Sequence, residues 1–343
     1  CNAGTGAGTM QTAPLILGTI TAPPYANTTC DAGKAGMLQW TGTSFQACGG
    51  TSWGSFATGG ALDDLTDAKT EYASLYNVFL GSGAGNAVTT GYSDTAVGYN
   101  SLYSNTTGYA NTAVGREALR TNTEGLHNTA IGREAMYATT TGQSNTAVGS
   151  SAVRSNTTGS GNTGIGSYGL YTNTTGSENS ALGREALYAN TTGGSNTAIG
   201  SYALRSNTSG SFSTAVGRDA LRIQTTGNNN TAVGYYALYA TTTGIRNTAI
   251  GNNSLDSNTT GSSNTAVGVD SLTANTSAIE NTAVGWGALG SNTTGYYNTA
   301  LGSYALYSSN TTQHNTGIGR YSLINNKGEA NSSLGSSSLG STT

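Results

Sequence analysis

The chain has 343 residues, of which only 8% are charged, and a formal net charge of −3. Soluble domains ordinarily have about 25% charged residues, and thirteen Lys and Arg against sixteen Asp and Glu provide no basic surface for nucleic acid or an anionic membrane. We therefore expect neither partner, and no apolar run is long enough for a transmembrane segment.

Residues 1–29 are predicted to be an extended tether or leader strand, because all three prolines (Pro14, Pro23 and Pro24) lie there. The sequence begins with Cys1, which is a candidate for lipidation if it is the mature N-terminus of a bacterial lipoprotein. The alternative is that the sequence given simply starts at this residue.

Residues 30–58 are predicted to form a small β-hairpin module. Two apolar segments, Met37–Trp40 and Ser44–Cys48, flank a short turn. Cys30 and Cys48 bracket this hairpin at a separation that a cross-strand disulfide can close, and a disulfide indicates an oxidising compartment. Zinc is the alternative, but two thiols without a nearby His or third Cys make a poor site. No metal is predicted.

Residues 59–93 are predicted to be a connector or trimerising collar. Ala61–Leu80 has the only helix-like apolar spacing in the chain. Gly81–Gly85 resembles a phosphate-binding loop in composition, but no βαβ unit surrounds it, so we predict no cofactor.

Residues 94–343 consist of fifteen copies of one unit, approximately N-T-A-(V/I/L)-G-x-x-(A/S)-L-x-x-N-T-T-G-x-x. A period this strict means that each unit contacts its neighbours in the same way, which predicts a solenoid. Disorder, the other interpretation of low charge and abundant Gly, would not keep this phase. The units start at Asp94, Asn111, Asn128, Asn145, Asn162, Asn179, Asn196, Ser213, Asn230, Asn247, Asn264, Asn281, Asn298, Asn315 and, after a step of sixteen, Asn331.

Each unit is predicted to contain two short strands and two turns. Positions 1–4 are rich in β-formers and precede a Gly that we expect at positive φ. An apolar side chain at position 9 marks the second strand, and Asn-Thr-Thr-Gly has turn chemistry. The predicted structural core comprises positions 4, 5 and 9, illustrated by Val114, Gly115, Leu119, Ile131, Gly132, Met136, Val148, Gly149 and Val153.

Self-association is predicted from the small number of apolar residues. Two apolar side chains per coil cannot offset the entropy of ordering seventeen residues, and the Asn-Thr-Thr-Gly side has none. We therefore expect a thin β-roll that completes its core in a homotrimer. Fifteen coils at the ordinary strand spacing of about 4.7–4.9 Å give a rod of about 70 Å.

Asn111–Ala118 and Asn128–Ala135 carry the pattern Asn-Thr-Ala-(Val/Ile)-Gly-x-x-Ala. This pattern resembles the head repeat of the trimeric autotransporter adhesins. The form that ends in Asn-Thr-Thr-Gly is also similar to repeats of phage tail fibres and bacterial surface fibres that carry an endosialidase-type intramolecular chaperone. The resemblance covers residues 94–343 and implies a parallel β-roll that assembles as a trimer. The period exceeds that of the adhesin heads, and this region contains no coiled-coil heptads, anchor strands or chaperone domain.

Position 10 is either Tyr or Arg in the first nine units. On a solenoid these side chains form one column, in which cation–π and ring contacts either stabilise the rod or present a binding stripe for a glycan or protein. His127 and His314 lie in variable positions with no partner for catalysis. The column comprises Tyr103, Arg120, Tyr137, Arg154, Tyr171, Tyr188, Arg205, Arg222 and Tyr239.

These features together predict an all-β, non-enzymatic, extracellular fibre of bacterial origin, which acts as an adhesin shaft or surface appendage. Three alternatives remain: a phage tail fibre shaft, a matrix filament that polymerises end to end, and an ice- or crystal-binding solenoid. The phage alternative is disfavoured by the Cys30 and Cys48 pair, the matrix filament is suggested by strand edges at solenoid ends, and the ice-binding alternative by recurrent Thr columns.

Overall fold

The computed structural model describes residues 38–40, 45–48, 53–55, 68–69 and 76–342, and the chain divides into two units, Cys1–Thr66 and Asp67–Thr343. In the first unit, β1 (Leu38–Trp40), β2 (Phe45–Cys48) and β3 (Trp53–Ser55) form an antiparallel sheet in that order. The predicted tether, Cys1 and Cys30 lie outside the described residues. The lipidation, the disulfide and the independent hairpin module therefore stay predictions.

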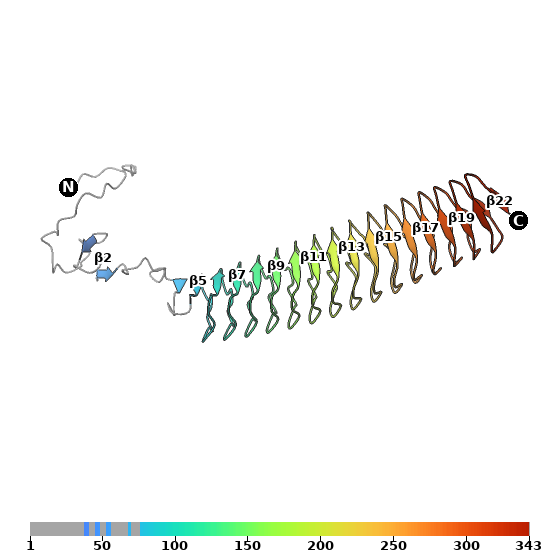
Figure 1. Cartoon of the computed structure of the whole chain (residues 1–343). Helices are drawn as coiled ribbons and strands as arrows, with labels where there is room; N and C mark the ends of the chain where they lie inside the picture. Colours follow the sequence, from blue (N-terminus) through green and yellow to red (C-terminus); the bar gives the residue numbers. More distant parts are fainter. Residues whose placement is uncertain (1–37, 41–44, 49–52, 56–67, 70–75, 343) are drawn as a thin grey trace, which may run out of the picture. The chain divides into compact units, whose positions relative to one another are not determined.

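The second unit is a parallel β-solenoid, in which each repeat contributes one three-residue strand. Every strand pairs in parallel with its equivalent in the next coil, at the same register throughout. Figure 1 shows these strands side by side in one row. The predicted solenoid of about fifteen coils is confirmed. Its strands are β5 (Val78–Leu80), β6 (Thr95–Val97), β7 (Thr112–Val114), β8 (Thr129–Ile131), β9 (Thr146–Val148), β10 (Thr163–Ile165), β11 (Ser180–Leu182), β12 (Thr197–Ile199), β13 (Thr214–Val216), β14 (Thr231–Val233), β15 (Thr248–Ile250), β16 (Thr265–Val267), β17 (Thr282–Val284), β18 (Thr299–Leu301), β19 (Thr316–Ile318) and β21 (Ser332–Leu334).

The solenoid begins one coil earlier than the sequence pattern indicated. β5 pairs in parallel with β6, and β4 (Ala68–Lys69) pairs antiparallel with β5. Residues 77–93 therefore form a coil, with buried Phe79 where other coils have Ala and Gly81 at φ 122° where they have the fifth-position Gly. The helix-like interpretation of this stretch is wrong at Val78–Leu80, and the described residues contain no helix. Gly81–Gly85, which resembles a phosphate-binding loop in composition, is part of this coil's turn.

Among the described coils, a second strand occurs only in the last two, where β20 (Asn325–Asn326) pairs in parallel with β22 (Ser341–Thr342). At position 9, where the second strand was predicted, the backbone is left-handed. Leu119 has φ 49° and Glu117 has φ 58°, and even the β-branched Val153 has φ 52°. Residues in this region of φ/ψ space cannot continue a strand. Hydrogen bonds between coils nevertheless continue through the turns, as the Leu102 amide donates to the Ala118 carbonyl at 3.0 Å.

Gly at position 5 has the predicted positive φ and a second constraint that only the stacked coils reveal. Gly149 has φ 137°, and a Cβ added to it would lie 2.7 Å from both the carbonyl carbon and the carbonyl oxygen of Gly166 in the next coil. Neither atom can move without shifting the neighbouring backbone, so glycine is required here for its size as well as its dihedral angle.

The apolar interior differs from the predicted one at position 4. A three-residue strand turns its middle side chain to one face and the outer two to the other. The Ala side chains at position 3 are buried, whereas Ile131 is 41% exposed and Val114 and Val148 are half-buried. The prediction of a buried position 4 is therefore wrong for the single chain. The predicted burial of position 9 is confirmed, since Leu119, Met136 and Val153 are fully buried.

Two ladders of buried Asn fill the side of the coil that has no apolar residues. In the coil that starts at Asn179, the Nδ2 groups of Asn179 and Asn190 both donate to the Gly193 carbonyl at 2.9 Å. The same groups donate to the Oδ1 atoms of their equivalents in the preceding coil, Asn162 at 3.1 Å and Asn173 at 2.7 Å. Buried polar groups that are paired in this way avoid the cost of desolvation. Each coil thus completes its interior without a second chain.

The position-12 ladder is broken in one of the first coils, where Thr139 replaces Asn. The Asn122 Oδ1 and Thr139 Oγ1 atoms are both buried without a hydrogen-bond partner. Thr139→Asn would supply a donor to Asn122 and an acceptor for Asn156, and we expect it to raise the free energy of unfolding by about 1–3 kcal/mol. Equilibrium denaturation measures this gain. The reverse change in an intact part of the ladder, Asn190→Thr, should cost a similar amount; a destabilised Thr139→Asn variant would contradict the ladder.

A carboxylate replaces Asn in the second coil of the position-1 ladder, which begins at Asn77, whose Oδ1 accepts the Asp94 amide at 2.8 Å. Asp94 is fully buried at position 1, where its Oδ1 accepts the Asn111 amide at 2.8 Å and its Oδ2 accepts Asn105 Nδ2 at 2.9 Å. Val88 stands at position 12 of the preceding coil, so Asn105 turns to Asp94 instead. Burial raises the pKa of the Asp94 carboxyl to about 6, although the hydrogen bonds from Asn111 and Asn105 oppose this rise.

Because this pKa lies above the ordinary value of 3.8, the folded coil binds the proton more tightly than the unfolded chain. We expect the stability of the first coils to fall by roughly 3 kcal/mol as pH rises from about 4 to about 6, and to stay level above that. Hydrogen exchange at the Asn111 amide, corrected for intrinsic exchange, measures this slope. In Asp94→Asn the slope should disappear, and its persistence would assign it to another group.

Candidate binding surface

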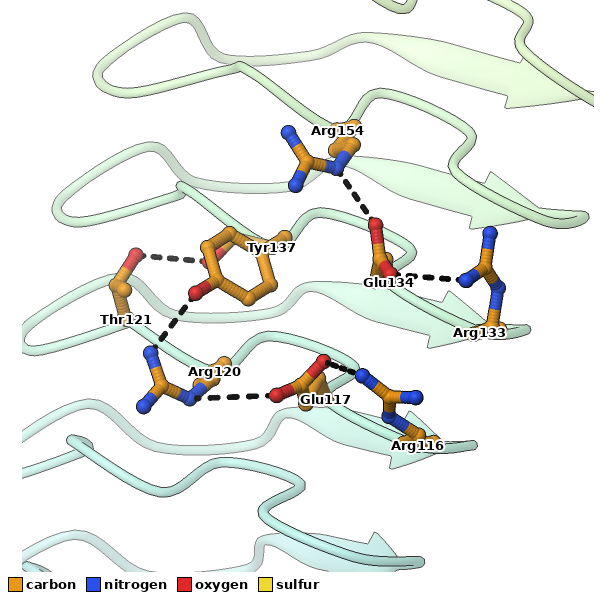
Figure 2. A network of polar contacts seen from close by, with 8 residues as sticks. All are labelled: Arg116, Glu117, Arg120, Thr121, Arg133, Glu134, Tyr137 and Arg154. Carbon is orange, nitrogen blue, oxygen red and sulfur yellow. Dashed lines mark hydrogen bonds and ion pairs between the residues drawn. The ribbon is translucent and has the colours of Figure 1, made fainter.

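One edge of the solenoid carries many of the charged side chains and many of the aromatic rings of the chain. It consists of the side chains at positions 6, 7 and 10 in the coils from Asp94 to Arg246, and we call it the arginine–tyrosine stripe. It holds eight Arg against three Glu and one Asp, a net charge of +4 on a chain whose total is −3. Figure 2 shows part of it, where these side chains from successive coils lie next to one another.

The predicted position-10 column forms. The Arg120 guanidinium lies 5.6 Å from the Tyr103 ring centroid and 5.5 Å from that of Tyr137, so it is sandwiched between rings of neighbouring coils. Further along, Tyr171 and Tyr188 stack with centroids 5.1 Å apart and ring planes 7° from parallel. The remaining contacts join Arg154 to Tyr137 and Tyr171, Arg205 to Tyr188, and Arg222 to Tyr239. The side chains of the column therefore stack on those of neighbouring coils, as one of the two interpretations predicted.

Carboxylates at position 7 tie the column to position 6, and the sequence analysis missed them. Glu134 lies 2.8 Å from Arg154 Nε and 3.1 Å from Arg133 Nη1 (Figure 2). The hydrogen bond from Arg154 holds the pKa of Glu134 below its ordinary value. Glu185 pairs with Arg205 of the next coil in the same way, whereas Glu117 pairs with Arg116 and Arg120, and Asp219 with Arg218 and Arg222, within one coil. The recurrence of Glu or Asp three residues before position 10 is the signal that could have revealed them.

The stripe is hollowed where three coils meet. Tyr168, Glu185, Tyr188 and Arg205 line a cavity of about 230 Å³. Tyr168 lies at position 7, where most neighbouring coils carry a polar or acidic residue, and its ring contacts Tyr171 edge to face at 5.4 Å and Tyr188 at 6.5 Å. Arg205 Nε donates to Glu185 Oε2 at 2.7 Å, and the Arg205 guanidinium lies 5.2 Å from the Tyr188 centroid.

The two histidines lie in ring contacts away from this stripe. His127 meets the edge of Tyr109 at 5.3 Å, and His314 lies between Tyr296 and Tyr297. Within residues whose side chains the structure describes, no three His, Cys, Asp or Glu gather to hold a metal ion. The described part of the chain also contains no helix that could span a membrane.

No protein-family model matches the chain, and neither a curated protein nor a solved structure shows significant similarity to it. The parallel β-solenoid is consistent with a β-roll repeat protein. Its function therefore has to be argued from its own surfaces.

If the column lies on the surface, removing one of its rings should barely affect folding. Tyr171→Ala deletes a half-buried ring, for which we expect a loss of about 0.5–1.5 kcal/mol. The neighbouring Leu170→Ala empties a fully buried position and should cost about 2–5 kcal/mol. Thermal and chemical denaturation compare the two variants. Equal losses would mean that the column is part of the structural core.

Proposed function

We propose that the protein is a non-enzymatic extracellular fibre, an adhesin shaft or surface appendage, whose solenoids associate as homotrimers through the outer face of the strand row. The observation that carries this proposal is the exposure of an aliphatic side chain at position 4 in coil after coil. Ile131 is 41% exposed and Leu182 is 47% exposed, although such residues are usually buried.

The outer strand face combines two columns. Position 2, which is Thr or Ser in the fifteen units from Asp94, and position 4, which is Val, Ile or Leu, alternate with the buried position 3 and so share this face. No charged residue occurs in these strands. A row of partly exposed aliphatic side chains on an uncharged face is typical of an interaction site in soluble proteins.

A second copy of the chain is the occupant that matches this face. The face repeats at the same register over all its coils, so a partner that covers it must offer a surface of the same length and repeat. Three chains around one axis close such an interface, and the resemblance to trimeric adhesin heads favours that number. An incomplete coil interior does not support a trimer, because the Asn ladders fill that interior. The exposed aliphatic side chains of the outer face are the structural support for the trimer.

Binding to ice or to a crystal surface is the second candidate for the same face. Thr at position 2 lies beside the aliphatic column, so hydroxyl and methyl groups recur with each coil. The Thr hydroxyls at position 13 are already engaged, as Thr174 Oγ1 donates to the Thr191 carbonyl at 3.0 Å. Thermal hysteresis in a monomeric sample would favour this candidate over the fibre. The phage tail fibre and the end-to-end filament stay alternatives on the same architecture.

Negative charge introduced on the outer strand face should prevent assembly and leave the fold of the single chain intact. We expect light scattering of the unmodified protein to give about three times the chain mass of 34.5 kDa. The double variant Val148→Asp/Leu182→Asp should shift it towards the monomer, because each unpaired carboxylate in an apolar interface costs several kcal/mol. Its circular dichroism should stay that of a β-solenoid, since both side chains are partly exposed in the single chain.

The matched control is Thr158→Asp/Thr192→Asp, which places the same charges at exposed position 14 of the same two coils. This variant should remain trimeric. A compact, stable monomer in the unmodified protein, or equal behaviour of the two double variants, would contradict the proposed interface.

A further inference from the structure

The cavity in the arginine–tyrosine stripe offers the groups that recognise a sugar ring. Tyr168 is 37% exposed and Tyr188 is half-buried, so ring surface is accessible to a ligand. Glu185 contributes a carboxylate that accepts hydroxyl hydrogens, and Arg205 contributes a guanidinium. A volume of about 230 Å³ is below the roughly 300–1,000 Å³ of sites for drug-sized ligands, which suits one monosaccharide unit.

The donors of Arg205 are only partly used within the chain. Its Nε is taken by Glu185, whereas its two terminal nitrogens make no hydrogen bond to the residues that the structure describes. Arg184, in the same coil as Glu185, contacts the Tyr202 ring at 4.5 Å and forms no ion pair with a described carboxylate. Two guanidinium groups thus retain binding capacity for a carboxylate, which Arg pairs with in bidentate geometry.

We propose that this cavity binds one carboxylated sugar residue of an acidic glycan. The sugar ring packs on Tyr168 and Tyr188, its carboxylate accepts from the terminal nitrogens of Arg205, and a hydroxyl donates to Glu185. The stripe's net charge of +4 attracts a polyanion along the neighbouring coils. This inference rests on the proposed role as an exposed adhesive fibre and names the chemical class that the fibre recognises.

A similar set of residues lies three coils earlier in the chain and can be compared with the cavity. Glu134, Tyr137 and Arg154 repeat the arrangement of Glu185, Tyr188 and Arg205, with the same Glu–Arg hydrogen bond at 2.8 Å. Glu117 stands there in place of Tyr168. Both carboxylates at that position are paired with Arg, and the additional ring is missing, so a sugar has no second ring to pack on. Tyr168 is therefore the residue that makes the later position a site.

A sugar fits the site better than a single-stranded nucleic acid, the other ligand that stacks on rings in a cationic groove. The stripe contains four carboxylates, and each lies within 4 Å of a guanidinium group. The phosphodiester of a nucleic acid has no hydrogen to donate to these carboxylates. A sugar hydroxyl, in contrast, donates to them.

Calorimetric titration of the full chain with tri-galacturonate and with sialyllactose tests the proposal, and the methyl ester of tri-galacturonate and lactose serve as neutral counterparts. We expect at least one acidic probe to bind about tenfold or more tightly than its neutral counterpart. Arg205→Gln should weaken that binding by about 10–100-fold and Tyr168→Ala by about fivefold or more. The matched variants Arg154→Gln and Tyr236→Ala lie outside the cavity, so they should weaken binding much less than Arg205→Gln, through the charge of the stripe alone.

Three results would overturn the proposal: no binding of either acidic probe at millimolar concentration, equal binding of a neutral counterpart, or equal losses in Arg205→Gln and Arg154→Gln. Tighter binding of a ten-residue oligothymidylate than of both sugars would assign the stripe to nucleic acid instead. Light scattering on the same samples separates this result from the fibre proposal. Arg205 lies on the stripe and not on the outer strand face, so its variant should keep the mass of the unmodified protein.

Discussion

The hydrogen bonds that converge on the position-15 carbonyl close most of the coils, and the remaining features of the solenoid depend on them. Two Asn side chains reach this carbonyl from positions 1 and 12, and each also bonds to its equivalent one coil away. One side-chain amide therefore closes its own coil and fixes the register of the next. A coil shifted by one residue would leave these buried amide groups without hydrogen-bond partners. Each unpaired group would then lower the free energy of unfolding by the cost of its desolvation.

Because the interior of a coil is narrow, most large side chains lie on the outside. Inside a coil there is room for Ala at positions 3 and 8, one Leu or similar residue at position 9, and the two Asn. The aliphatic side chain at position 4 and the rings at positions 7 and 10 lie towards solvent. The protein consequently has two repeated surfaces of different chemistry, one apolar and uncharged, the other aromatic and rich in Arg. We assign assembly to the first and ligand recognition to the second.

The two surfaces differ in how strictly they repeat along the solenoid. The outer strand face is the same in nearly every coil, which suits association of identical rods over their length. The stripe changes from coil to coil, since Tyr168 replaces Glu at position 7 and the ion pairs differ in geometry. Repetition is what an assembly surface needs, because its partner repeats too. Local variation is what a specific binding site needs, and only a few coils provide it.

The sequence by itself determined the architecture, because a strict period of seventeen leaves each coil only its neighbours to contact. It also determined that position 5 must be Gly, that position 9 is buried and that Tyr and Arg form one column. It did not reveal the first coil at residues 77–93, since Phe79 and Val88 replace the small and polar residues of the repeat.

Only the tertiary structure decided which side of the strand faces inward. Val at position 4 is more hydrophobic than Ala at position 3, so burial was assigned to Val148, but the narrow interior accepts only the smaller residue. Asn was likewise interpreted as a turn residue, because a buried amide ladder forms only once coils stack at matching register. The cavity beside Tyr168 also depends on stacking: the period of seventeen aligns Tyr188 with Arg205, but only the structure brings Tyr168 and Glu185 beside them.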